Sequence, residues 1–149
     1  MEIDELRTSI EGWAEDEGSQ LEARRLAVRL VDEHLRRGTD VMLPQYLGRT
    51  AFITELEQTA RAAGAQFVEV RLVADEAAVV ARFEARRAST TGVAHPEHEV
   101  DDVRAAVADA MTRLELIARG RPDAVTVTAD DDIEVTLTRL AAVLEALER

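Results

Sequence analysis

The stretch GTDVMLPQYLGRTAFITELEQTARAAGAQFVEVRL, residues 38–72, decides the fold that we expect for this chain. Its apolar run at residues 41–43 is typical of a short buried strand, which ends at Pro44 because proline cannot donate a ladder hydrogen bond. Residues 50–63 have a helical pattern closed by Gly64, and residues 67–73 alternate apolar and polar side chains as a strand does. A strand, a helix and a second strand require a crossover connection, so we expect an α/β fold with a mostly parallel sheet.

The rest of the chain is predicted to form further helices and one more strand. We expect helices at residues 3–13, 21–37, 74–88, 99–118 and 131–147, and a third strand at residues 124–128. Small residues and a proline interrupt the pattern after residue 88, so we expect residues 92–98 to be the most mobile internal segment. Apolar residues repeat at spacings of three and four from Val100 to Ile117. This repeat spans only about two and a half heptads and favours a core-facing stripe over a coiled coil.

The composition of the 149 residues favours a single globular domain, residues 1–149, that is rich in helix. With 46% hydrophobic but only 3% aromatic residues, its core must be built from leucine, valine, alanine and isoleucine. The formal net charge of -12 repels phosphate backbones, so we expect no nucleic-acid partner.

The residue types that are missing from the sequence exclude several chemistries. The chain has no cysteine, which excludes disulfides, thiolate catalysis and cysteine-ligated zinc. It also has no lysine, and its three histidines are scattered, so we expect neither ammonium chemistry nor a dedicated metal site. The N-terminus does not resemble a secretion signal, and no apolar stretch approaches the roughly 20 residues of a membrane span. We therefore expect a cytoplasmic protein without a membrane partner.

Four segments follow one another in an informative order. They are IDELR at residues 3–7, HLRRGTDVMLPQYLGRTAF at residues 34–52, GAQFVEVRLVADEAAVVARFEARR at residues 64–87, and a His-Pro loop at residues 95–96. This order resembles the P-loop kinase-like ATPases, in particular the small-molecule kinases of the zeta-toxin and chloramphenicol phosphotransferase type, which are often described simply as AAA-type ATPase domains. The resemblance covers most of the chain and implies a three-layer, helix-rich P-loop NTPase-like sheet.

The family's phosphate-binding loop is missing from these residues. The family begins with a strand and a loop of the form G-x-x-x-x-G-K-[ST], which binds the phosphates of ATP, and no such motif is present here. The resemblance implies that the chain starts after that strand, so its sheet is incomplete at the N-terminus. In the family the missing strand lies between the strands that match residues 41–43 and 67–73. We therefore expect self-association, or completion by a separate N-terminal segment, to satisfy the unpaired strand edges.

The resemblance also implies a set of substrate-site residues. Asp4 corresponds to the base that accepts the proton of the substrate hydroxyl, and Arg7 to an arginine that orients the substrate. Gln45 follows the first expected strand, where many nucleotide-binding domains place an acid that holds Mg²⁺ through water, and Arg49 could contact substrate. Each residue also has an ordinary interpretation: an acidic first helical turn for Asp4 and Arg7, a polar strand end for Gln45, and a solvated side chain for Arg49.

A second group of arginines could bind phosphate. Arg82 and Arg86 are four residues apart on one helical face, with Arg87 beside them. In the family such arginines belong to a lid that clamps the transferred phosphate. Alternatively, they simply complement the dipole at a helix C-terminus. His95 and His98 are three residues apart near glutamates, and a surface turn explains them better than a metal site does.

Two classes of function remain open. The first is a truncated or degenerate ATP-dependent small-molecule kinase, with an unknown hydroxyl-bearing substrate, that is inactive without its phosphate loop. The second is a non-catalytic binding or self-association module derived from the same fold. ATP and Mg²⁺ are implied by the family only, and we expect this chain alone to bind neither.

Overall fold

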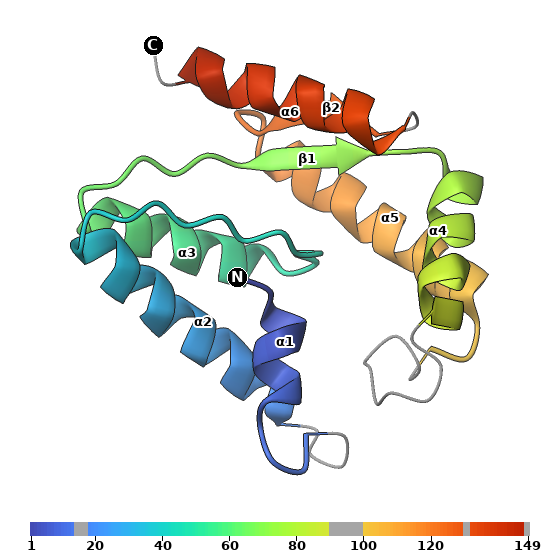
Figure 1. The fold of residues 1–149 in the computed structure, drawn as a ribbon, viewed down its shortest axis with the longest axis horizontal. Helices are drawn as coiled ribbons and strands as arrows, with labels where there is room; N and C mark the ends of the chain where they lie inside the picture. The colour runs from blue at the N-terminus through green and yellow to red at the C-terminus, as the bar shows by residue number, and fades with distance from the viewer. Residues whose placement is uncertain (14–17, 90–99, 130–131, 148–149) are drawn as a thin grey trace. The chain divides into compact units, whose positions relative to one another are not determined.

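The computed structural model describes residues 1–13, 18–89, 100–129 and 132–147. These residues form six helices and two strands (Figure 1). The elements are α1 (Ile3–Thr8), α2 (Ser19–Arg36), α3 (Thr50–Ala62), β1 (Val70–Val73), α4 (Glu76–Ser89), α5 (Val103–Gly120), β2 (Val125–Thr128) and α6 (Ile133–Leu147). The expected loop at residues 92–98, with His95 and His98, lies outside the described residues.

The chain forms two compact units. Residues 1–67 and Val100 belong to the N-terminal unit, and residues 68–89 and 101–147 belong to the C-terminal unit. The N-terminal unit therefore contains α1 to α3, and the C-terminal unit contains both strands with α4 to α6. No helix of the described residues is long and apolar enough to cross a membrane.

The N-terminal unit is built on one face of α2. Ala23, Ala27 and Val31 are four residues apart on this helix and are all buried, as expected of a helix that packs along one stripe. They form a core with Ile3 of α1 and with α3, which contributes Phe52 and Leu56. Alanine at the centre of α2 lets the neighbouring helices approach closely, and Figure 1 shows α1 and α3 beside α2.

Glycines end two of these helices, as the sequence predicts. Gly38 follows α2 with a φ of 75°, and Gly64 follows α3 with a φ of 74°. Both values lie in the left-handed region that favours glycine. The predicted ends of the helices at residues 37 and 63 are therefore confirmed to within one residue.

The predicted strand at residues 41–43 is wrong. These residues are part of the irregular connection between α2 and α3. Val41 and Leu43 pack against the helical core, while Met42 between them is 61% exposed. The alternating side chains are thus covered by helices on one side only, and no described strand lies beside them to form a ladder. Met42 O instead accepts a hydrogen bond from the terminal amine of Met1 at 3.0 Å.

The C-terminal unit contains a two-stranded parallel sheet. Val70 pairs with Val125 and Val73 with Thr128, and α4 and α5, which contact each other, form the crossover between the strands. Parallel pairing of these two segments agrees with the long connection between them. The predicted three-layer P-loop NTPase-like sheet of an α/β domain is nevertheless wrong, because the described residues form a helix-rich fold with only two strands.

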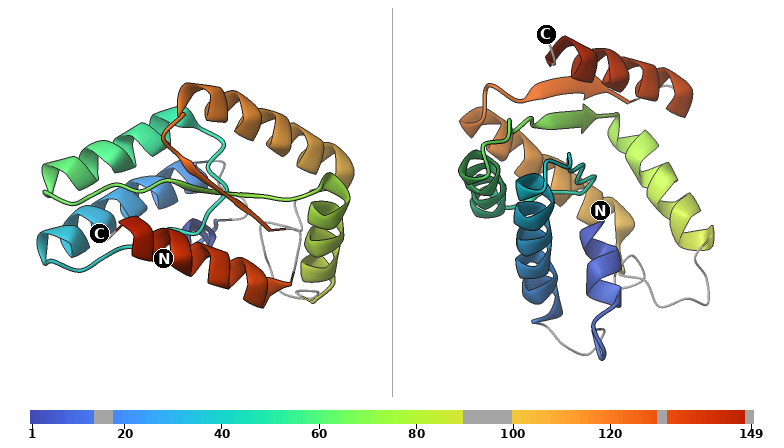
Figure 2. Two further views of the ribbon diagram at one scale, coloured as in Figure 1. Left: turned by 90° about the horizontal axis from the view of Figure 1, so that it is seen from above. Right: turned by 60° about the vertical axis from the view of Figure 1, so that its left-hand side comes forward.

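Helices α5 and α6 of this unit differ in how many of their residues are buried. On α5, Val103, Val107 and Ile117 are buried, which confirms a core-facing stripe. These three buried side chains are therefore not available for association with a second copy. Helix α6 contacts β2 (Figure 2), yet none of its residues is buried, and Ile133 and Leu137 are 70% and 51% exposed.

Candidate functional site

Asp4 and Gln45 meet in the N-terminal unit although they are 41 residues apart in the chain. The amide Nε2 of Gln45 donates a hydrogen bond of 3.3 Å to Oδ2 of Asp4 in a partly buried position. Asp4 is held there because its neighbour Ile3 is part of the core. Gln45 is held by the connection whose residues Val41, Leu43 and Leu47 pack on the same core. Two residues that the sequence singled out are thus brought together.

Arg24 joins these residues from α2, and sequence reasoning missed it. The pKa of Arg24 is lowered, first because the side chain is partly buried and second because the positive charge of Arg49 lies near it, while the charge of Asp4 acts in the opposite direction. Arg24 therefore lies within electrostatic reach of both residues. We call Asp4, Arg24, Gln45 and Arg49 the Asp4 cluster. One sequence feature could have pointed to Arg24: it directly follows Ala23, a fully buried residue of the α2 stripe.

The two arginines of the Asp4 cluster make few hydrogen bonds and no ion pair within the described residues. Arg24 donates from Nη2 to the neutral amide oxygen of Gln20 at 3.3 Å. Arg49 forms no hydrogen bond or ion pair within the described part of the chain. It is the N-cap residue of α3, and no side-chain hydrogen bond caps this helix, whose first turn contains no acidic residue. Two cations and one carboxylate give the cluster a net positive charge in an acidic chain.

Arg7 is buried, with 6% of its surface exposed. Its Nε donates to Ser19 Oγ at 2.9 Å, and its guanidinium lies 4.9 Å from the centre of the Trp13 ring. The hydroxyl of Ser19 in turn donates to the carbonyl oxygen of Trp13 at 3.0 Å. These contacts join α1 to the first turn of α2, and so connect the helix that carries Asp4 with the helix that carries Arg24.

The three arginines of the expected lid lie on α4, in the C-terminal unit. Arg82 and Arg86 are exposed and Arg87 is partly buried. The guanidinium of Arg86 lies 5.9 Å from the centre of the Phe83 ring. Arg86 and Arg87 belong to the last turn of the helix, where cations complement the helix dipole.

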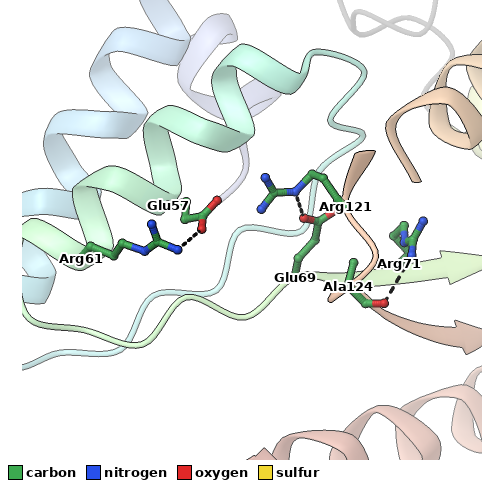
Figure 3. Close-up of polar contacts among 6 residues, drawn as sticks. All are labelled: Glu57, Arg61, Glu69, Arg71, Arg121 and Ala124. Carbon is green, nitrogen blue, oxygen red and sulfur yellow. Dashed lines mark hydrogen bonds and ion pairs between the residues drawn. The ribbon is translucent and has the colours of Figure 1, made fainter. Parts of the chain in front are cut away.

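Other polar contacts in the C-terminal unit hold the start of its sheet. Arg121 forms a largely buried ion pair with Glu69, and Arg71 donates from Nη2 to the carbonyl oxygen of Ala124 at 3.3 Å (Figure 3). Nε of Arg71 is buried and has no hydrogen-bond partner among the residues that the structure describes. These contacts link residues more than 50 positions apart in the chain, so they fix β1 against the segment that enters β2.

A groove of about 390 Å³ lies between α2 and α3 of the N-terminal unit. Its lining residues are Val28, Arg29, Asp32, Glu55, Gln58, Thr59 and Ala62. The carboxylate of Asp32 is already bonded to Arg36 at 2.8 Å, and on α3 Glu57 is bonded to Arg61 at 2.6 Å (Figure 3). The groove contains none of the predicted site residues. In the described part of the chain, no group of three or more acidic or histidine side chains could hold a metal ion.

Comparisons with protein-family models, with curated protein sequences and with solved structures find no match to this chain. The geometry of the Asp4 cluster is therefore the main guide to function.

Proposed function

We propose that the N-terminal unit binds a small hydroxyl-bearing molecule at the Asp4 cluster, as the substrate-binding part of a small-molecule phosphotransferase. The observation that carries this proposal is the hydrogen bond from Gln45 to Asp4 across 41 residues of sequence. Gln45 bonds to one carboxylate oxygen of Asp4, and a carboxylate has a second oxygen that can accept the proton of a substrate hydroxyl. The neutral amide orients Asp4 without neutralising its charge.

Phosphoryl transfer needs groups that these 149 residues do not supply. A phosphate loop cradles ATP through backbone N–H groups and a lysine, and the sequence has neither the motif nor a lysine. On this proposal the ATP site comes from a segment outside these residues. For the C-terminal unit by itself, the phosphate-binding role of Arg82, Arg86 and Arg87 stays a proposal that the resemblance implies. The present chain binds substrate and does not transfer phosphate by itself.

Ligand-observed NMR on the full chain tests substrate binding. The probes are a panel of monosaccharides, nucleosides and amino alcohols, each with its phosphorylated or carboxylated derivative. We expect at least one hydroxyl-bearing probe to bind, and Asp4→Asn to weaken it about tenfold, because the carboxylate then loses its charge as an acceptor. Asp40→Asn is the matched control, since Asp40 is exposed in the same connection that carries Gln45. If no probe distinguishes Asp4→Asn from Asp40→Asn, the proposal is wrong.

A second candidate function is self-association, and the free edge of β1 favours it. The ladder uses the carbonyl oxygens of Glu69 and Val73, so the backbone groups of Val70 and Leu72 face the other edge. No described strand pairs with that edge. A two-stranded sheet is marginal in isolation, and an edge strand can pair with its own copy about a two-fold axis. Sedimentation equilibrium of the chain and of its Leu72→Lys variant tests this candidate.

A further inference from the structure

The groove between α2 and α3 is lined by two side chains of opposite charge, one from each helix. Figures 1 and 2 show these helices side by side. Arg29 of α2 and Glu55 of α3 both line the groove of about 390 Å³. Within the described part of the chain, neither side chain forms a hydrogen bond or an ion pair, with the other or with any further residue. The groove therefore contains one cation and one anion that the fold leaves open to a ligand.

Arg29 has no carboxylate partner because the acidic residues near it on α2 are already paired. Asp32, three residues on, is bonded to Arg36 at 2.8 Å. Glu33, four residues on, is bonded to Arg37 at 2.5 Å. Positions three and four residues away are the neighbours on a helix surface, and neither of those before Arg29 is acidic. The carboxylate of Asp32, which also lines the groove, is thus neutralised by Arg36.

Glu55 lacks a cationic partner for a similar reason. The single basic residue of α3 is Arg61, and it is bonded to Glu57 at 2.6 Å. The hydroxyl of Thr59 donates to the backbone oxygen of Glu55 at 2.8 Å, so its proton is not directed at the carboxylate. The carboxylate of Glu55 can accept hydrogen bonds from a ligand that brings its own donors.

We propose that this groove binds a small zwitterion with an apolar side chain, such as a free amino acid. The ligand carboxylate contacts Arg29, because a guanidinium binds a carboxylate through paired N–H···O bonds. The ligand ammonium group donates to Glu55. Val28 and Ala62 also line the groove, and they offer apolar surface to the ligand side chain. The groove volume lies within the range of small-molecule sites, about 300 to 1,000 Å³.

This site is separate from the Asp4 cluster, none of whose residues lines the groove, so the inference does not rest on the proposed function. Arg29 and Glu55 are both exposed, and ion pairs in contact with water contribute little. We therefore expect weak binding, with a Kd of about 1 mM for leucine. Leucine should bind more tightly than glycine, because it also covers apolar surface.

Titration of the full, ¹⁵N-labelled chain with leucine and two derivatives tests the site. Leucinamide lacks the carboxylate, and N-acetyl-leucine lacks the ammonium group. The readout is the shift of backbone amide NMR signals at constant ionic strength. We expect leucine to bind saturably, with the largest shifts at residues that line the groove. Each derivative should bind about three- to fivefold more weakly than leucine, because it has lost one ionic contact.

Two variants match these derivatives. Arg29→Gln should weaken leucine about three- to fivefold and leave leucinamide unchanged, because leucinamide already lacks the group that Arg29 contacts. Glu55→Gln should likewise weaken leucine and leave N-acetyl-leucine unchanged. Arg25→Gln and Glu22→Gln are the controls, since this exposed ion pair lies outside the groove, and both should bind leucine as the wild type does. Absence of saturable leucine binding, leucinamide binding as tightly as leucine, or equal weakening by the controls overturns the inference.

Discussion

The Nε atom of Arg7 donates a hydrogen bond to the hydroxyl oxygen of Ser19 at 2.9 Å, and both residues are buried in the N-terminal unit. Arg7 lies three residues after Asp4 on α1, and Ser19 begins α2, the helix that carries Arg24. The bond therefore joins the two helices that build most of the Asp4 cluster. The resemblance gave Arg7 a role in orienting substrate, and that role stays a prediction. Its contacts in this structure also give it a structural task.

We predict that Arg7→Met lowers the free energy of unfolding by about 2 to 4 kcal/mol. The substitution removes a charge-assisted hydrogen bond, leaves the buried Ser19 hydroxyl with one partner fewer, and removes the contact with Trp13. Arg25→Met is the control and should change the unfolding free energy by less than about 0.5 kcal/mol, because its ion pair with Glu22 is exposed. Urea unfolding followed by circular dichroism measures both. Equal stability of the two variants would show that the Arg7 contacts contribute little to folding.

Arg24→Met should leave the N-terminal unit at least as stable as the wild type, because the partly exposed charge contributes no favourable ion pair. The pKa of Arg24 is lowered by partial burial and by Arg49, so the charged form is less favourable in the folded chain than in the unfolded chain. This cost is present at every pH well below the folded pKa, and it is lost only as the pH rises from the folded pKa to the higher unfolded pKa.

The lowered pKa of Arg24 also determines how the stability of this variant should depend on pH. Because arginine stays charged throughout the usual working range, the stability difference between Arg24→Met and wild type should be constant between about pH 6 and 9. Thermal unfolding at several pH values checks this. A clear loss of stability in Arg24→Met would mean that the packing of the side chain against its neighbours outweighs the charge repulsion.

Gly38→Ala should destabilise the chain by about 1 to 2 kcal/mol, because Gly38 has a φ of 75° and the left-handed region is unfavourable for alanine. No atom lies within 4 Å of the position that its Cβ would occupy, so backbone strain is the only cause. Gly120→Ala is the comparison, since Gly120 ends helix α5 and also has open space around it. It should be neutral or stabilising by up to about 1 kcal/mol. Differential scanning calorimetry of the two variants should give opposite or clearly unequal shifts.

The sequence predicted local structure better than it predicted the sheet. Gly38 and Gly64 end helices where expected, because the left-handed conformation is a local requirement that glycine meets. The run at residues 41–43 was misassigned because a short apolar run indicates that side chains are covered and does not show by what. Here a helical core covers Val41 and Leu43. A strand needs a neighbour, and that is a long-range property.

The candidate site was predictable only in part for a similar reason. Asp4 and Gln45 were singled out from the resemblance, and their contact depends on how α1 and the connection after α2 pack on one core. Arg24 carried no local signal beyond its place next to Ala23, because its pKa is lowered first by burial and then by the charge of Arg49 before α3, while Asp4 on α1 acts in the opposite direction. Residues from separate helices influence one another's charge in this way only once the helices are packed.

The chain by itself should not bind ATP and Mg²⁺ with useful affinity. It lacks the phosphate loop and lysine that bind the β- and γ-phosphates, and its net charge of -12 repels a triphosphate. Isothermal titration with MgATP should show no saturable heat at micromolar concentration. One-to-one binding with a micromolar or tighter Kd would contradict this prediction.

Sedimentation equilibrium should show that the chain forms dimers at micromolar concentration through the free edge of β1. Leu72 on this edge is 54% exposed, and pairing of β1 with its own copy would satisfy the outward backbone groups and cover this side chain. A four-residue strand supplies a small interface, so we expect a weak and reversible dimer. Because each chain carries a net charge of -12, added salt should strengthen the dimer by screening the repulsion between copies.

Leu72→Lys should make the chain monomeric, because it places a charge on the pairing edge while changing an already exposed side chain. Leu116→Lys is the matched control, since Leu116 lies on α5 and is 59% exposed; it should leave the dimer intact. Circular dichroism should show both variants folded, so a loss of the dimer cannot be attributed to unfolding. A wild-type chain that melts cooperatively as a monomer at all concentrations would exclude association through β1, and its two-stranded sheet would then be stabilised by α4, α5 and α6 alone.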